Sequence, residues 1–140
     1  MGRVFSPHLV KLEKITMTIL EAIHIIDGAK PNSCTPSEKI RWLSSLDGRI
    51  KREIIDTHEG GENIPFTGYQ DNTDLNTTLL VPTPYDNIYV HFLEAQIDYA
   101  NGEYKKYNNS TAAYNSAFSE YAKAYNRNNM PKATAKRFIF

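Results

Sequence analysis

The chain has 140 residues, of which 41% are hydrophobic and 23% charged, and its 16 basic and 16 acidic side chains cancel. A chain of this length forms one domain with a core that needs no disulfide or metal, and its composition differs from that of disordered segments. The zero net charge excludes a global electrostatic field that would gather nucleic acid or an acidic membrane surface.

Residues 1–16 show no clear hydrophobic period and precede a second methionine, Met17. We interpret them as a loosely held arm or as an upstream extension of the reading frame. The helical domain is expected to span residues 17–131, and residues 132–140 are expected to form a C-terminal tail.

The first helix is predicted directly after Met17. Thr18 and Glu21 have the spacing of a capping box, in which the hydroxyl and the carboxylate each accept a hydrogen bond from a backbone amide. Apolar residues then recur at helical spacing, and Gly28 and Pro31 indicate the end of the helix.

The second helix has the clearest signal in the sequence. Thr35 is expected at its N-cap, Pro36 at its first position and Glu38 in a second capping box. Its isoleucines and leucines step by three or four residues, which is typical of an amphipathic helix. The Gly60–Gly61 pair is expected to end it.

Residues 60–82 show no helical period and contain several glycines and prolines. The stretch "DLNTTLLV" has strand character, but a lone strand has no partner within the chain, so we expect a long irregular loop between the second and third helices. A loop of this length in a compact domain is usually functional or disordered, which makes it a candidate contact surface.

Two further helices are predicted after this loop. Thr83 is expected as the N-cap of the third helix, with Pro84 at its first position. Gly102 and the Asn108–Asn109 pair indicate a break before the fourth helix, which is expected to end before Pro131. The expected fold class is therefore all-α, a small bundle of about four helices.

No group of residues predicts catalysis, a cofactor or a metal site. The four histidines lack metal-ligand spacing, the acidic residues of the loop lack the pattern of a calcium site, and the glycines form no phosphate loop. The one cysteine, Cys34, has no histidine nearby in sequence to act as a base, and it suits a reducing compartment. No apolar run reaches the roughly 18 residues of a membrane span. We therefore predict a soluble protein that is not an enzyme.

The segment 104–126 contains five tyrosines and four asparagines. Its lysines are offset by acidic residues, so it lacks the basic groove that accompanies aromatic stacking on nucleic acid. Four aromatic residues instead share one helical stripe: Tyr114, Phe118, Tyr121 and Tyr125. Tyrosine buries its ring and keeps its hydroxyl hydrogen-bonded, so we predict that this stripe forms an interhelical and intersubunit surface.

The C-terminal tail is basic and ends on an apolar tip. Lys136 and Arg137 precede Phe138, Ile139 and Phe140. Two interpretations stay open, because the tip either fills a groove on a neighbouring molecule or belongs to a frayed end. In the first case these five residues join the aromatic stripe as interface residues.

Two long strings carry a family resemblance. They are "EKIRWLSSLDGRIKREIIDTHEG" and "LLVPTPYDNIYVHFLEAQIDYANGEYKKYNNS", and the second is followed by "YNRNNMP". From about Met17 to Pro131 the chain resembles small structural proteins encoded in the head-gene clusters of tailed bacteriophages and prophages of Gram-positive bacteria. Such proteins look like head–tail connectors, also called adaptors or head-completion proteins.

The resemblance implies a mostly helical virion protein that docks under the portal, completes the DNA-filled head and receives the tail. The partners it implies are the portal protein, tail-side completion proteins and further copies of the chain in a ring, while a free subunit can stay a monomer. It places the protein at the head–tail junction of the virion, and in the host cytoplasm during assembly. No membrane contact and at most non-specific DNA contact are expected.

Two alternative functions stay open from the sequence. The first is a DNA-binding or packaging accessory protein that uses the tyrosine-rich helices. The second is a tail-completion protein or an assembly chaperone with the same helical fold.

Overall fold

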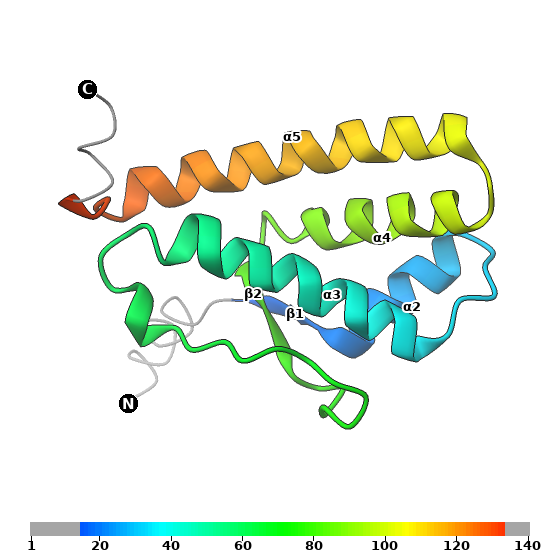
Figure 1. Cartoon of the computed structure of the whole chain (residues 1–140), viewed down its shortest axis with the longest axis horizontal. Coiled ribbons are helices and arrows are strands. Elements are labelled where there is room, and N and C mark those ends of the chain that lie inside the picture. The colour runs from blue at the N-terminus through cyan, green and yellow to red at the C-terminus, as the bar shows by residue number, and fades with distance from the viewer. Residues whose placement is uncertain (1–14, 134–140) are drawn as a thin grey trace, which may run out of the picture.

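The structure of the chain is a computed structural model that describes residues 15–133. In this part of the chain, four α-helices lie against a two-stranded antiparallel sheet (Figure 1). The helices are α2 (Ile19–Ala29), α3 (Pro36–Ile50), α4 (Asn87–Ala100) and α5 (Tyr104–Asn128), and the strands are β1 (Thr16–Thr18) and β2 (Thr78–Pro82). The prediction of a mainly helical domain is confirmed, but a purely all-α fold is wrong.

The small sheet is the main departure from the predicted fold. Strand β1 pairs with β2, with Thr16 opposite Pro82 and Thr18 opposite Thr78. The amide of Thr83 also donates a hydrogen bond to the carbonyl of Ile15 at 2.8 Å. The expectation that a strand near residue 80 lacks a partner is therefore wrong, because the residues just before the first helix supply one.

Both predicted capping boxes are present. The hydroxyl of Thr18 accepts a hydrogen bond from the amide of Glu21 at 3.1 Å, and the carboxylate of Glu21 accepts one from the amide of Thr18 at 2.9 Å. The same pair of bonds joins Thr35 and Glu38 at 3.1 Å and 2.8 Å, and Pro36 follows the cap as predicted. Each cap of this kind stabilises its helix by about 1 kcal/mol.

The predicted start of the third helix is wrong. Helix α4 begins at Asn87 and has Asp86 rather than Thr83 as its N-cap residue. The chain first leaves β2 through a turn, in which the amide of Tyr85 donates to the carbonyl of Pro82 at 2.9 Å. The hydroxyl of Thr83 donates to the carboxylate of Asp86 at 2.9 Å, so it stabilises the turn and not the helix end.

Two other helix boundaries also differ from the prediction. Gly102 does mark the turn before the last helix, since its φ of 73° is a left-handed conformation that favours glycine. The Asn108–Asn109 pair is no break, because it lies inside α5, which ends before Pro131 as predicted. The second helix continues past α3 as one π-helical turn and stops at Ile55, short of the Gly60–Gly61 pair.

The core lies between the helices and one face of β2. Helices α4 and α5 run antiparallel side by side, with α3 and α2 packed beneath them (Figure 1). The largest fully buried aliphatic side chains come from α2, α3 with its π-helical turn, β2 and α4, and none comes from α5: Ile19, Ile26, Leu43, Leu46, Ile50, Ile55, Val81, Ile88, Leu93 and Ile97. Helix α5 instead contributes tyrosines and alanines to its buried face.

One buried carboxylate lies where four segments of the chain meet. Asp47 of α3 is fully buried, and its Oδ1 accepts a hydrogen bond from the hydroxyl of Tyr89 in α4 at 2.6 Å. Its Oδ2 accepts two more, from the hydroxyl of Tyr69 at 2.5 Å and from the amide of Leu80 in β2 at 3.1 Å. The hydroxyl of Tyr89 in turn accepts from the amide of Val81 at 2.7 Å. This Asp47 network joins α3, α4, β2 and the predicted loop.

The environment of Asp47 makes the stability of the fold depend on pH. Burial raises the pKa of the Asp47 carboxyl to about 6, although the hydrogen bonds from Tyr69, Tyr89 and the Leu80 amide lower it. A carboxyl in the unfolded chain has a pKa of about 3.9, so the folded protein binds this proton more tightly. The stabilisation from this group is fully present below about pH 4 and is lost as the pH rises through about 6, with an amplitude of about 3 kcal/mol.

We predict that Asp47→Asn removes this pH dependence. The free energy of unfolding of the wild type, minus that of the variant, should fall by about 3 kcal/mol as the pH rises from about 4 to about 7. Urea unfolding followed by circular dichroism at several pH values measures this difference. Asp71→Asn, at an exposed position, is the matched control and should show no such trend. Identical pH profiles for the wild type and Asp47→Asn contradict the prediction.

Candidate functional site

The aromatic stripe predicted from the sequence lies on the face of α5 that packs on the rest of the chain, with Tyr114 against Phe92 of α4 and Phe118 against Arg49 of α3. Tyr114 is 7% exposed and Tyr121 is 5% exposed, whereas Phe118 and Tyr125 are half-buried. The stripe therefore packs mainly between helices of the chain itself. Its role between subunits stays a prediction. Phe118 and Tyr125 keep larger accessible surfaces than Tyr114 and Tyr121, so these two residues are the better placed for such a contact.

One end of the stripe is closed by an arginine from α3. The guanidinium of Arg49 lies 4.1 Å from the centre of the Phe118 ring. Its Nη1 donates a hydrogen bond to the hydroxyl of Tyr114 at 2.9 Å, and its Nε donates to the carboxylate of Glu53 at 3.2 Å. The Tyr114 hydroxyl thus has a hydrogen-bond partner within the chain.

The other end of the stripe opens into a cavity of about 410 Å³, which we call the tyrosine cavity. This volume lies within the range of about 300–1,000 Å³ that is typical of ligand pockets. The walls come from the turn after β2, the last turns of α5 and the segment after α3: Ile64, Pro82, Thr83, Tyr85, Tyr121, Ala124, Tyr125, Asn128 and Asn129.

Three tyrosine rings form the aromatic wall of the tyrosine cavity. The ring centre of Tyr121 lies 5.8 Å from that of Tyr85, at an interplanar angle of 50°. It lies 5.9 Å from the ring centre of Tyr125, at an angle of 57°. Tilted rings at this spacing present faces and edges together, and such a wall suits aliphatic groups, further aromatic rings and cations.

Polar atoms also face the tyrosine cavity. Among residues 15–133, no residue forms a hydrogen bond with the Tyr121 hydroxyl. Some side-chain atoms in that range are both fully inaccessible and without a hydrogen-bond partner, but the Tyr121 oxygen is not one of them. Tyr121 is only 5% exposed, and it is one of the residues that line the cavity. Burial, followed by the neighbouring Tyr125 and Asp47, raises the pKa of Tyr121, so the hydroxyl keeps its proton near neutral pH.

Two asparagines add acceptor oxygens at the rim. The side-chain amide of Asn128 donates to the carbonyl of Ala124 at 3.0 Å, and that of Asn129 donates to the carbonyl of Tyr125 at 3.0 Å. These bonds satisfy the last carbonyls of α5 and use the amide nitrogens. Among residues 15–133, neither Oδ1 atom has a hydrogen-bond partner.

After the tyrosine cavity the chain is held on the turn that follows α3. Residues 130–132 and residues 57–59 exchange two backbone hydrogen bonds of 2.8 Å and 3.0 Å. Between these bonds, His58 and Pro131 form an antiparallel bridge. None of these residues lines the tyrosine cavity. These bonds fix the backbone of residues 130–132 just before Ala133, the last described residue.

His58 secures this attachment. Its side chain is only 7% exposed. Its Nδ1 lies 2.7 Å from the carbonyl oxygen of Ile54, its Nε2 lies 3.0 Å from Oδ1 of Asn126, and its ring contacts that of Tyr125 edge to face at 5.0 Å. A single histidine in a sequence gives no signal for this role.

The remaining predicted interface residues, namely Lys136, Arg137, Phe138, Ile139 and Phe140, lie outside the described residues. Their part in an interface stays a prediction.

A second, larger groove of about 640 Å³ lies along α2 and β1. It is bordered by exposed apolar side chains, including Leu20 and Ile25. Its carboxylates are already engaged, because Glu21 caps α2 and Asp86 accepts a hydrogen bond from Thr83. Among residues 15–133, no unpartnered, nearly buried polar side chain lines this groove, so the smaller tyrosine cavity is the better candidate site.

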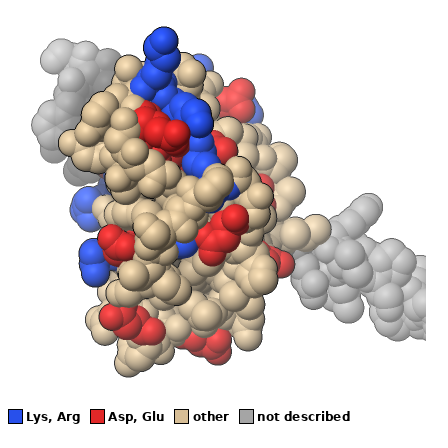
Figure 2. Space-filling model, turned by 90° about the vertical axis from the view of Figure 1, so that its right-hand side faces the viewer, with Lys and Arg blue, Asp and Glu red and all other residues tan. Residues whose placement is uncertain are grey.

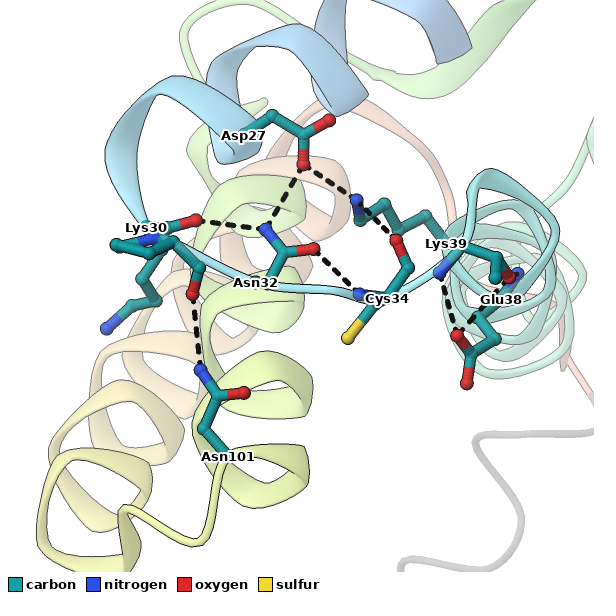
Figure 3. A network of polar contacts seen from close by, with 9 residues as sticks. Asp27, Lys30, Asn32, Cys34, Glu38, Lys39 and Asn101 are labelled. Atoms are coloured by element: carbon teal, nitrogen blue, oxygen red, sulfur yellow. Dashed lines mark hydrogen bonds and ion pairs between the residues drawn. The ribbon is translucent and has the colours of Figure 1, made fainter.

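A polar network near Cys34 is structural (Figure 3). The buried ammonium of Lys39 lies 2.7 Å from the carboxylate of Asp27 and donates to the carbonyl of Cys34 at 3.0 Å. Asn32 donates to the same carboxylate at 3.2 Å. Burial, followed by the charge of Glu38, raises the pKa of the Cys34 thiol, which keeps the sulfur in its unreactive protonated form.

Within residues 15–133, no three His, Cys, Asp or Glu side chains come together in a way that would hold a metal ion. Over the same residues, no helix combines the length and the apolar character needed to cross a lipid bilayer.

We predict that the two kinds of buried tyrosine hydroxyl respond differently to removal. Tyr121→Phe should change the free energy of unfolding by less than about 0.5 kcal/mol, because no hydrogen bond within residues 15–133 is lost. Tyr89→Phe should cost about 1–3 kcal/mol, since it leaves the Val81 amide and one Asp47 oxygen without a partner. Chemical unfolding of both variants tests this pair. Equal losses of stability would show that the Tyr121 hydroxyl has a structural partner after all.

Comparisons with known proteins leave the chain without an assigned relative. No family model matches the sequence, and neither the curated proteins nor the solved structures include a match to it.

Proposed function

We propose that this chain is a structural assembly protein of a tailed-phage virion, a head–tail connector that docks under the portal, completes the DNA-filled head and receives the tail. The proposal rests on the resemblance of residues 17–131 to such proteins. The observation that supports it best is the tyrosine cavity, an open, mainly apolar site with unused hydrogen-bonding atoms, placed where the chain leaves its last helix.

The use of the buried ionisable groups supports an assembly role over a catalytic one. The Asp47 carboxylate accepts three hydrogen bonds from within the chain. The buried Asp98 lies 2.7 Å from the ammonium of Lys30 and accepts from the hydroxyl of Ser110 at 2.7 Å. Lys39 is bonded to Asp27 and to a backbone carbonyl. Ionisable groups that are paired within the chain in this way stabilise the fold and are not arranged for proton transfer.

A connector needs a rigid body with separate surfaces for different neighbours. In this proposal, the packed helices supply the body, and the tyrosine cavity and the chain ends supply contacts. Its partners are the portal protein, tail-side completion proteins and further copies of the chain, arranged as a ring at the head–tail junction. A free subunit can stay a monomer before it meets a portal.

We expect the purified chain to bind portal-bearing, DNA-filled heads that lack their own connector, and to restore infectious particles when tails are added. Truncation after Ala133 should weaken head binding at least about tenfold, because it removes the apolar tip and two positive charges. Co-sedimentation with heads and plaque counts measure the two effects. Ile25→Ser, in the groove along α2, is the control. Absence of binding by the full chain would overturn the proposed function.

A DNA-binding or packaging accessory role is the second candidate, and one observation favours it. Tyr99 and Tyr104 are 60% and 59% exposed at the α4–α5 turn. The ring of Tyr99 lies 5.5 Å from that of Tyr104 and 5.3 Å from that of Tyr107. Lysines follow Tyr104 directly, but Lys106 pairs with Glu103 at 3.3 Å. Positive and negative side chains are interleaved on the face that contains this end of the molecule (Figure 2).

We expect at most weak duplex DNA binding that disappears between about 50 mM and about 200 mM salt, because phosphate contacts from few lysines are strongly screened. Fluorescence anisotropy with labelled DNA measures this. Tight binding that persists at the higher salt and is lost in Tyr104→Ala would favour the accessory role.

A different observation distinguishes the tail-completion and chaperone roles, because a chaperone would be absent from finished virions.

A further inference from the structure

We propose that the groove along α2 and β1 is the docking surface for residues 1–14 of the same chain, and that apolar side chains of this segment cover it. The inference goes beyond the proposed function and does not depend on it. It assigns an interaction surface and its occupant, in place of the loosely held arm that the sequence analysis expects.

The groove gathers exposed aliphatic side chains. Ile15, Leu20 and Ile25 are 75%, 37% and 44% exposed, and all three line it. Among residues 15–133, Leu75 is the only other leucine or isoleucine of similar exposure. Exposed apolar side chains that gather in one hollow are typical of a surface that another segment covers.

The described chain begins inside this groove. Ile15 lines it, and the carbonyl of Ile15 accepts a hydrogen bond at 2.8 Å from the amide of Thr83, which lines it as well. The 14 preceding residues are therefore covalently joined to a residue of the groove wall. A segment tethered in this way has an effective concentration in about the millimolar range, which gives it an advantage over a free ligand.

The preceding segment is long enough to cover the groove. Helix α2 has 11 residues and forms one side of the groove, so this side is about 16 Å long. Fourteen residues in an extended conformation span up to about 46 Å. Residues 1–14 therefore reach along the whole of α2 from their attachment at Ile15.

The preceding segment also has apolar side chains that suit the groove. They include two valines, two leucines and a phenylalanine, namely Val4, Phe5, Leu9, Val10 and Leu12. Contact between these side chains and Ile15, Leu20 or Ile25 removes apolar surface of both partners from water.

Charge favours the same occupant. The carboxylates of Glu21 and Asp86 line the groove, and among residues 15–133 no lysine or arginine lines it. Their hydrogen-bond donors, the Thr18 amide and the Thr83 hydroxyl, are uncharged, and neither carboxylate forms an ion pair within residues 15–133. Residues 1–14 carry three basic side chains and one acidic one: Arg3, Lys11, Lys14 and Glu13. The basic segment thus meets a surface of opposite charge.

Tryptic cleavage of the full chain tests the docking. A docked segment is a poor substrate, and cleavage follows the population of the open form. Ile25→Ser should therefore speed cleavage after Lys11 and Lys14 about tenfold, as followed by mass spectrometry. Leu75→Ser is the matched control, because Leu75 is exposed to a similar extent but does not line the groove. Equal cleavage rates in the wild type and in Ile25→Ser overturn the proposal.

Disulfide formation locates the contact without dependence on the stability of Ile25→Ser. In a Cys34→Ser background, Ile25→Cys is combined in turn with Phe5→Cys, Leu9→Cys or Leu12→Cys. At least one pair should form a disulfide under mild oxidation, which requires Cα atoms within about 7 Å. Tyr99→Cys, exposed at the α4–α5 turn, replaces Ile25→Cys in the control and should form none. Failure of all three pairs overturns the proposal.

The source of the segment is decided with the same variants. A disulfide within one copy leaves the chain at its monomer mass on a non-reducing gel and forms at a rate that does not depend on protein concentration. Disulfides that join two copies, at a rate that rises with concentration, would overturn the assignment to the same chain. Head binding is measured separately, so failure of this inference leaves the connector function standing.

Discussion

The arrangement of this fold depends on a carboxylate that has been taken out of water. Asp47 receives hydrogen bonds from two tyrosine hydroxyls and one strand amide, and each donor comes from a different segment of the chain. Burying a charge without partners is strongly unfavourable, so the three donors must be in place together. This requirement fixes β2 against α3 and α4, and it brings the turn after β2 to the end of α5, where the tyrosine cavity forms.

The tyrosines of the chain differ in what their hydroxyls contact, and this difference separates structural from candidate functional residues. Tyr69 and Tyr89 bind Asp47, and Tyr114 binds Arg49, so these three act as hydrogen-bonded parts of the core. Tyr121 shares the helical stripe of Tyr114, but it lines a cavity, and its hydroxyl has no hydrogen-bond partner among residues 15–133. One end of the stripe thus packs within the chain, and the other end borders the candidate site.

Much of the helical framework was predictable because its signals are local. A capping box needs residues three apart, as at Thr18 and Glu21, and an apolar stripe needs only a period along the chain. The stripe on α5 was predictable for the same reason. The errors arose where a distant partner decided the outcome, as for β2, whose partner strand is about sixty residues earlier in sequence. Likewise, Thr83 resembles a helix cap in sequence but stabilises a turn in the structure.

By itself the sequence determined where α2 and α3 begin, which residues of α5 share a face, and that the chain carries no obvious catalytic motif. The tertiary structure decided which side chains meet. It buried Asp47 and His58, gave the Tyr114 hydroxyl a partner, and left that of Tyr121 facing a cavity. The physical reason is that helix capping and periodicity act within a few residues, whereas the burial of a polar group depends on donors and acceptors brought together from distant parts of the chain.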